Sequence, residues 1–279
     1  MIINVECADK MIEDICEYLD VVPEYLKERI IDIANDSMDG KCFNSEKFME
    51  LSNEFILEYN SEPIDEIYIC HLTRNIGKPE LLMSVTDLLT TDNSFSSFLK
   101  ENKITFSYQD SKLIMEYNGK KIPPKNIYDF SKVENEHTRL AARLGYLGEK
   151  DFCINGFLFA IEPENSTDGY YRLLMEGPEL LQDIDAFLST NLIKEYQKHS
   201  KYYFAMIRVP LSRIIFDEKK EWNNFEDKTR IFLTCCFEFL MTWYEKTECS
   251  PGLYNEMMRL DDYSSAVVDH YIELEDFYS

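Results

Sequence analysis

The sequence changes its hydrophobic period at Lys103, and this change most constrains the fold. From Ile104 to Tyr117 apolar and polar residues alternate, which is the pattern of a half-buried β-strand. Gln109-Asp110-Ser111 interrupts the alternation and predicts a hairpin turn. Asn118-Gly119 is a second turn signal and predicts that Lys120 to Ile122 return as a third strand. The chain must therefore combine a β-hairpin with the helical pattern that dominates elsewhere.

Apolar residues recur at helical spacing in most of the remaining chain. We expect three helices within residues 1–62, where Pro23 is well placed to begin the second. Further helices are expected over 81–89, 95–99, 134–146, 180–188 and 231–241. Short β-favouring runs predict strands near 66–71, 151–161, with a bulge at Gly156, and 201–216. We therefore predict an α+β fold in which helices cover one mixed or antiparallel sheet that includes the hairpin.

The composition is that of a globular chain. Its 279 residues can bury a sizeable core, and 45% of them are hydrophobic against 29% charged. We expect two parts: a helical N-terminal segment at 1–62, and an α+β core at 63–279 that ends in a C-terminal helix and an acidic tail.

The net charge of the chain indicates which kinds of partner it can bind. The 52 acidic and 29 basic residues leave a formal charge of −23, which repels nucleic-acid phosphates and anionic membrane lipids. We therefore expect neither nucleic acid nor a membrane as a partner. Such a surface serves solubility, and it also fits a basic protein partner or a mimic of nucleic acid.

The cysteines and histidines indicate neither disulfides nor a metal. The N-terminal residues show no basic or apolar segment of a signal peptide, so we expect a cytoplasmic protein with its eight cysteines reduced. No Cys-x-x-Cys pair occurs, and the four histidines lack the short spacing of metal ligands. We expect no metal site.

A polar cluster follows the apolar run Ile67 to Cys70. It consists of His71, Thr73 and Arg74, and we expect it to emerge at the end of the strand, where folds often place binding groups. Later in the chain come the pair Tyr170-Tyr171 and the acids Glu176 and Glu179.

These residues loosely resemble the ADP-ribosyltransferase family of the His-Tyr-Glu type. The resemblance implies that His71 and Thr73 hold NAD, with Arg74 beside them, and that Tyr170 or Tyr171 stacks on the nicotinamide. A glutamate would stabilise the ribosyl cation as the glycosidic bond breaks, and this residue could be Glu176, Glu179 or Glu273. The catalytic residues implied are thus His71, Tyr170, Tyr171, Glu176 and Glu179, with NAD as the cofactor.

Four short motifs also resemble an uncharacterised group of bacterial proteins, and the strand that carries His71 resembles one found in abortive-infection components. The motifs are Cys-His-Leu-Thr-Arg, Arg-Leu-Gly at 143–145, Asp-x-Cys-Ile-Asn-Gly-Phe at 151–157 and Gly-Pro-Glu at 177–179. This resemblance implies an intracellular bacterial defence or toxin–antitoxin protein with an ADP-ribosyltransferase-like core.

A non-catalytic interpretation competes with this one. His71 can be a hydrogen-bonded structural histidine, and Arg139 and Arg143 can be partners for this chain's carboxylates. In that case the chain is an acidic protein-binding factor, such as an immunity or anti-defence protein, whose helical face engages a protein partner.

Overall fold

The computed structural model describes residues 2–59, 62–122, 136–148, 152–160, 169–216, 225–244, 255–261 and 264–274. The chain has the predicted α+β fold. Its contacts divide it into two compact units. The first consists of Met1–Cys70, Gly156–Asp168 and Arg208–Arg259, and the second of His71–Asn155, Gly169–Ile207 and Leu260–Ser279.

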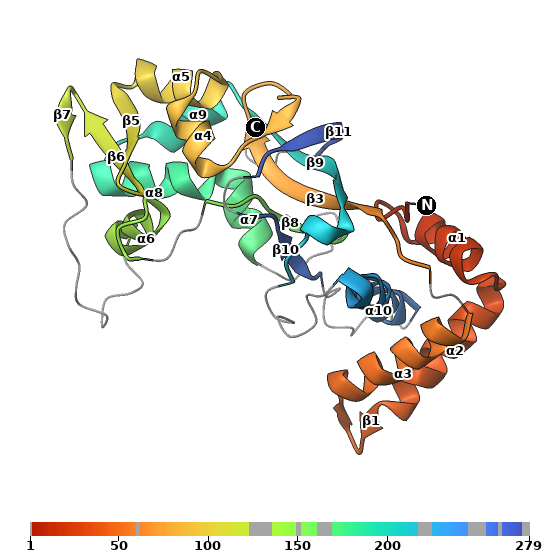
Figure 1. Ribbon diagram of the computed structural model, residues 1–279. Coiled ribbons are helices and arrows are strands. Elements are labelled where there is room, and N and C mark those ends of the chain that lie inside the picture. The colour runs from red at the N-terminus through yellow and green to blue at the C-terminus, as the bar shows by residue number, and fades with distance from the viewer. Residues whose placement is uncertain are drawn as a thin grey trace. The chain divides into compact units, whose positions relative to one another are not determined.

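Helices dominate the first unit. The N-terminal residues form α1 (Ala8–Leu19), α2 (Pro23–Asp36) and α3 (Ser45–Tyr59), as predicted. A small hairpin of β1 (Met38–Asp39) and β2 (Cys42–Phe43) joins α2 to α3. The long helix α10 (Phe225–Tyr244) contacts both α2 and α3 (Figure 1). The apolar stripes of the N-terminal helices are therefore covered partly by a helix that comes far later in the chain.

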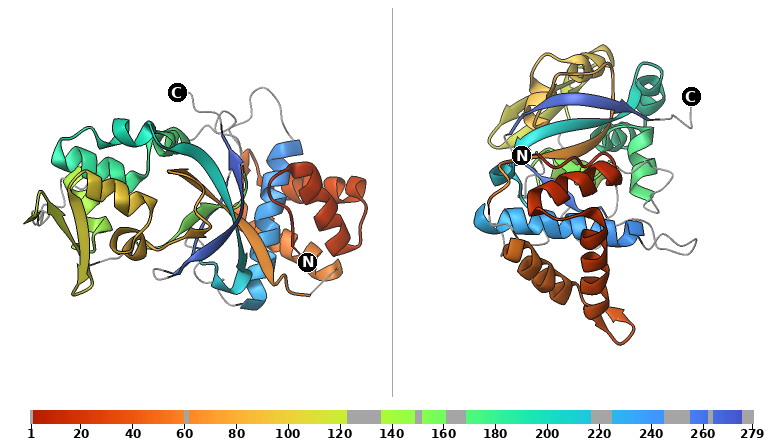
Figure 2. Two further views of the ribbon diagram at one scale, coloured as in Figure 1. Left: turned by 90° about the horizontal axis from the view of Figure 1, so that it is seen from above. Right: turned by 90° about the vertical axis from the view of Figure 1, so that its right-hand side faces the viewer.

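A six-stranded sheet has the order β10-β8-β3-β9-β11-β4. Its two longest strands are β3 (Glu66–Asn75) and β9 (Lys201–Pro210). The others are β4 (Leu81–Leu82), β8 (Asn155–Phe157), β10 (Met257–Arg259) and β11 (Ala266–Glu273). Antiparallel pairing joins β11 to β9 over most of its length, and the two strands run side by side in the right-hand view of Figure 2.

The strand boundaries correct several expectations. Strand β3 continues to Asn75, so the His-x-Thr-Arg cluster lies within the strand and not after it. Of the described residues 152–160 in the expected strand 151–161, only Asn155–Phe157 form a strand. Neighbouring backbone groups bond elsewhere: Phe152 O accepts from Val85 N. After Pro210 the chain turns into a 3₁₀ helix at Leu211–Arg213. The expected helix at 81–89 begins only at α4 (Val85–Thr90), since Leu81-Leu82 pairs with β11.

The C-terminal residues were expected to form only a tail after the last helix, and this was wrong. They include β10 and the eight-residue strand β11. The mixture of acids and aromatics in Ala266–Glu273 did not indicate a strand. This mixture is compatible with β11 because the strand is only partly buried and its pairing with β9 is irregular between Val268 and His270.

The predicted hairpin forms, but in a sheet of its own. Strands β5 (Ile104–Gln109), β6 (Lys112–Tyr117) and β7 (Lys120–Lys121) make a three-stranded sheet in the second unit. Both turns have positive φ at their two central residues, Asp110-Ser111 and Asn118-Gly119, which matches the twist of a tight hairpin. The expectation of one sheet was wrong, because the pattern of a half-buried strand does not specify its partner.

The helices of the second unit form a core with this hairpin. They are α4, α5 (Ser94–Glu101), α6 (Glu136–Arg143), α7 (Gly169–Glu176), α8 (Glu179–Leu188) and α9 (Leu192–Gln197). Leu113 and Met115 of β6 pack in this core with Leu140 of α6 and Leu181 of α8. Gly145 ends α6 with φ +80°, and Tyr146 N donates to Ala141 O across it.

Gly145→Ala should destabilise the protein by roughly 2–4 kcal/mol, from positive-φ strain plus crowding, because an added Cβ would lie 2.8 Å from Ser111 O. Gly148 is the matched control, since its φ is +91° and no atom lies within 4 Å of an added Cβ. Gly148→Ala should cost only about 1–2 kcal/mol. Urea unfolding measures both, and equal losses would contradict the contact with Ser111.

Candidate functional site

The polar cluster on β3 is divided between the two faces of the strand. Side chains alternate along a strand, so His71, Thr73 and Asn75 share one face while Leu72 and Arg74 share the other. The first three are half-buried and the last two are buried. The three residues expected to bind a cofactor therefore do not point in one direction.

The ring of His71 is held by one hydrogen bond. Its Nδ1 lies 2.6 Å from the backbone oxygen of Asn155. A carbonyl oxygen can only accept, so Nδ1 carries the proton and Nε2 keeps its lone pair. Desolvation by burial lowers the pKa of His71, and the bond to Asn155 partly opposes the shift. The ring is thus a neutral imidazole with one nitrogen available as an acceptor.

Arg74 is a buried structural residue. Its guanidinium donates to Ser200 Oγ at 2.9 Å, Ser200 O at 3.1 Å, Met175 O at 3.2 Å and Gln197 O at 3.3 Å. Tyr196 in turn donates its hydroxyl proton to Arg74 O at 3.0 Å. Together these bonds join β3 to the end of α7 and to α9, and they occupy guanidinium donors that the sequence assigned to a cofactor.

The tyrosines and glutamates of the expected site lie on three elements: α7, the start of α8 and β11. The backbone of Tyr170 and Tyr171 belongs to α7, but their side chains lie outside the described residues. The same helix meets β3 through Arg74, on the face opposite His71. Glu176 is exposed, and its backbone oxygen accepts from Gln197 Nε2 at 2.8 Å. Glu273, on β11, pairs with Lys201, which lowers the pKa of its carboxyl group.

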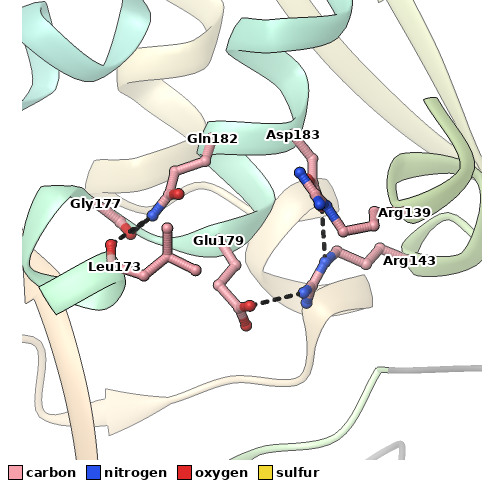
Figure 3. A network of polar contacts seen from close by, with 7 residues as sticks. All are labelled: Arg139, Arg143, Leu173, Gly177, Glu179, Gln182 and Asp183. Atoms are coloured by element: carbon pink, nitrogen blue, oxygen red, sulfur yellow. Dashed lines mark hydrogen bonds and ion pairs between the residues drawn. The ribbon is translucent and has the colours of Figure 1, made fainter. Parts of the chain in front are cut away.

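Glu179 belongs to an ion-pair network between α6 and α8, shown in Figure 3. Arg139 and Arg143 each direct Nε to one oxygen of Asp183, at 3.0 and 2.9 Å, and Arg143 also contacts Glu179 at 3.1 Å. The Asp183 side chain is only 4% exposed. A buried carboxylate needs such partners, so the two arginines pair with carboxylates, as the non-catalytic interpretation expected.

Asp183 was not singled out in the sequence, and Asn155 was named only as part of the motif at 151–157, with no role assigned to it. A signal for Asp183 was present, because a charged residue interrupts the apolar stripe of Leu180, Leu181 and Ile184. Asn155 gave no comparable signal, since its contact with His71 uses a backbone oxygen that every residue has.

The helices of the first unit carry rows of exposed carboxylates spaced four residues apart. Residues at this spacing share one helix face and lie about 6 Å apart. The rows are Asp9, Glu13 and Glu17 on α1, Glu24, Glu28, Asp32 and Asp36 on α2, and Glu46, Glu50, Glu54 and Glu58 on α3. Within the described part of the chain, the only ion pair among them joins Asp32 to Arg29 at 3.6 Å.

Among the described residues, no group of three or more His, Cys, Asp or Glu side chains is placed to hold a metal ion. None of the helices in that part of the chain is both long and apolar enough to cross a membrane. Comparison with known proteins found no match for this chain among family models, curated proteins or solved structures.

Arg74→Met should lower the free energy of unfolding by roughly 2–4 kcal/mol, because it leaves buried carbonyl oxygens without donors. Arg139→Met is the control: its side chain is 50% exposed, and Asp183 keeps Arg143, so about 1 kcal/mol is expected. Urea titration of the two variants tests the structural role of Arg74. Equal midpoints for the two variants would contradict it.

Proposed function

We propose that this chain is a non-catalytic binding protein whose acidic helices α1, α2 and α3 engage a basic surface of a protein partner. The observation that carries the proposal is the set of carboxylate rows on these helices, nearly all without a cationic partner in the described structure. An immunity or anti-defence role would place such a surface on a partner that otherwise binds nucleic acid.

The energetics support a partner for these rows. Like charges four residues apart destabilise a helix by about 0.2–0.5 kcal/mol per pair. Their spacing of about 6 Å is shorter than the Debye length of about 8 Å at physiological salt, so solution ions screen them only in part. A soluble surface usually mixes both signs. A cationic partner would remove the repulsion and gain charge-assisted contacts at the same time.

The partner class follows from the spacing. A regular row of carboxylates resembles the row of phosphates along a nucleic-acid strand, because both attract lysine and arginine side chains. A protein with a cationic groove for nucleic acid therefore fits this surface better than a neutral or acidic protein does. Association would be fast at low salt and would weaken as salt rises.

The test uses polylysine as a probe of the surface and measures its affinity by titration calorimetry at two salt concentrations. The row variant carries Glu50→Gln, Glu54→Gln and Glu58→Gln on α3. The control variant carries Glu80→Gln, Asp110→Asn and Glu101→Gln in the second unit, so both variants change the net charge equally. We expect a loss of roughly tenfold for the row variant and less than twofold for the control.

A second readout is stability. The free energy of unfolding of the row variant should exceed that of the wild type by about 0.6–1.5 kcal/mol, because three repulsive pairs are removed: Glu46–Glu50, Glu50–Glu54 and Glu54–Glu58. Equal losses of affinity in the two charge-matched variants would show that polylysine responds only to net charge and would overturn the proposal.

A second candidate function is the NAD-dependent ADP-ribosyltransferase-like activity. It is favoured by the shared face of His71 and Thr73 and by the acceptor nitrogen that the bond to Asn155 leaves on His71. In this function His71 would bind a ribose hydroxyl group, with Thr73 beside it on the same face of β3.

Incubation with labelled NAD tests this second candidate. We expect NAD to bind the wild type and His71→Ala to lose that binding, while Glu50→Gln, on an exposed helix face, keeps it. Unchanged behaviour of His71→Ala, or no NAD binding by the wild type, would contradict the candidate and leave the acidic surface as the proposed site.

A further inference from the structure

A small cavity in the second unit lies between α5 and the start of β5. Its volume is about 200 Å³. A cavity of roughly 150 Å³ can hold benzene, whereas pockets for drug-sized ligands measure roughly 300–1,000 Å³. The cavity is therefore the right size for one six-membered ring.

The lining has an apolar part and a polar part. Leu89, Leu99 and Ile104 contribute buried apolar side chains, and the half-buried ring of Phe106 joins them. Such a surface packs against the C–H groups of a ring. The polar residues of the lining include Asp92, in the turn before α5, and Ser97 and Lys100 on α5.

Asp92, Ser97 and Lys100 are exposed residues of the lining, so water can solvate them when no ligand is bound. Within the described residues, Asp92 and Lys100 form no ion pair and the Ser97 hydroxyl forms no hydrogen bond. Lys100 and Ser97 are three residues apart on α5 and share one face of the helix. The cavity thus offers a carboxylate acceptor, an ammonium donor and a hydroxyl that is both.

The turn that carries Asp92 is held in place. Asn93 and Ser96 form a capping box at the start of α5, and Ser96 Oγ also donates to Thr91 O at 2.7 Å. Thr91 Oγ1 donates to Asp87 O at 2.7 Å. The polar groups therefore stand on a fixed backbone, which limits the entropy lost when a ligand binds.

We propose that this cavity binds an uncharged polyhydroxylated ring, a monosaccharide or the sugar of a larger ligand. The net charge of −23 and Asp92 disfavour an anion, and Lys100 disfavours a cation. Vicinal hydroxyl groups can donate to Asp92 and accept from Lys100 and Ser97, while the C–H face of the ring covers the apolar part of the lining.

The test titrates D-glucose, D-galactose and D-ribose, separately, into the full-length ¹⁵N-labelled protein and follows the amide chemical shifts by NMR. We expect saturable shifts confined to residues 89–106 for at least one sugar, with a Kd on the order of 1–10 mM. Ribose 5-phosphate, which adds a dianion to the same ring, should bind at least tenfold more weakly than ribose.

Asp92→Asn keeps the shape of the side chain and should weaken sugar binding roughly tenfold, because a hydrogen bond to a charged group is lost. Asp110→Asn, the same change at an exposed position in the turn between β5 and β6, is the control and should bind as the wild type does. The amide spectrum of each variant shows directly whether it is folded. The proposal is overturned if none of the three sugars gives saturable shifts in residues 89–106, or if Asp92→Asn keeps wild-type affinity.

Discussion

The buried guanidinium of Arg74 connects the central strand of the sheet to helices that come a hundred residues later. It donates to backbone oxygens of Met175, Gln197 and Ser200, which lie at or just beyond the ends of α7 and α9. Carbonyl groups at a helix C-terminus lack partners within the helix, and they carry the negative end of its dipole. The guanidinium group is planar and holds several donors in a fixed geometry. It can therefore bind these carbonyl oxygens better than a lysine ammonium group could. The position of these two helices on β3 depends on that residue.

The two units differ in whether their carboxylates are paired with cations. The second unit neutralises its buried carboxylate Asp183 with two arginines, at distances of 3.0 and 2.9 Å. The first unit leaves rows of exposed carboxylates on α1, α2 and α3 without such partners. Burial explains the difference, since a buried charge must be paired whereas a hydrated one need not be. Of these two sets of carboxylates, the exposed rows are the ones that remain available to another molecule, and the proposed binding function rests on them.

The candidate site was predictable in part. The apolar run before His71 predicted the strand that leads to it, but not that Thr73 lies on the same strand; in the structure β3 continues to Asn75, and alternation then places His71 and Thr73 on one face. The separation of Arg74 from them follows from the same alternation once the strand is known to continue to Asn75. The sequence placed the end of that strand too early, because a polar cluster resembles a strand terminus. The partner of His71 is a backbone oxygen, and no residue type marks such a group.

The sequence by itself determined the local structure: the three N-terminal helices, the hairpin with its two turns, and the α+β class. These depend on period, capping and turn residues, which act over a few positions. Only the tertiary structure decided that the hairpin forms a separate sheet, that α10 covers α2 and α3, and that the C-terminal residues add β11 to the main sheet. Strand pairing and helix packing join residues far apart in the chain. Their choice depends on the surfaces that meet after folding, and a local pattern does not contain that information.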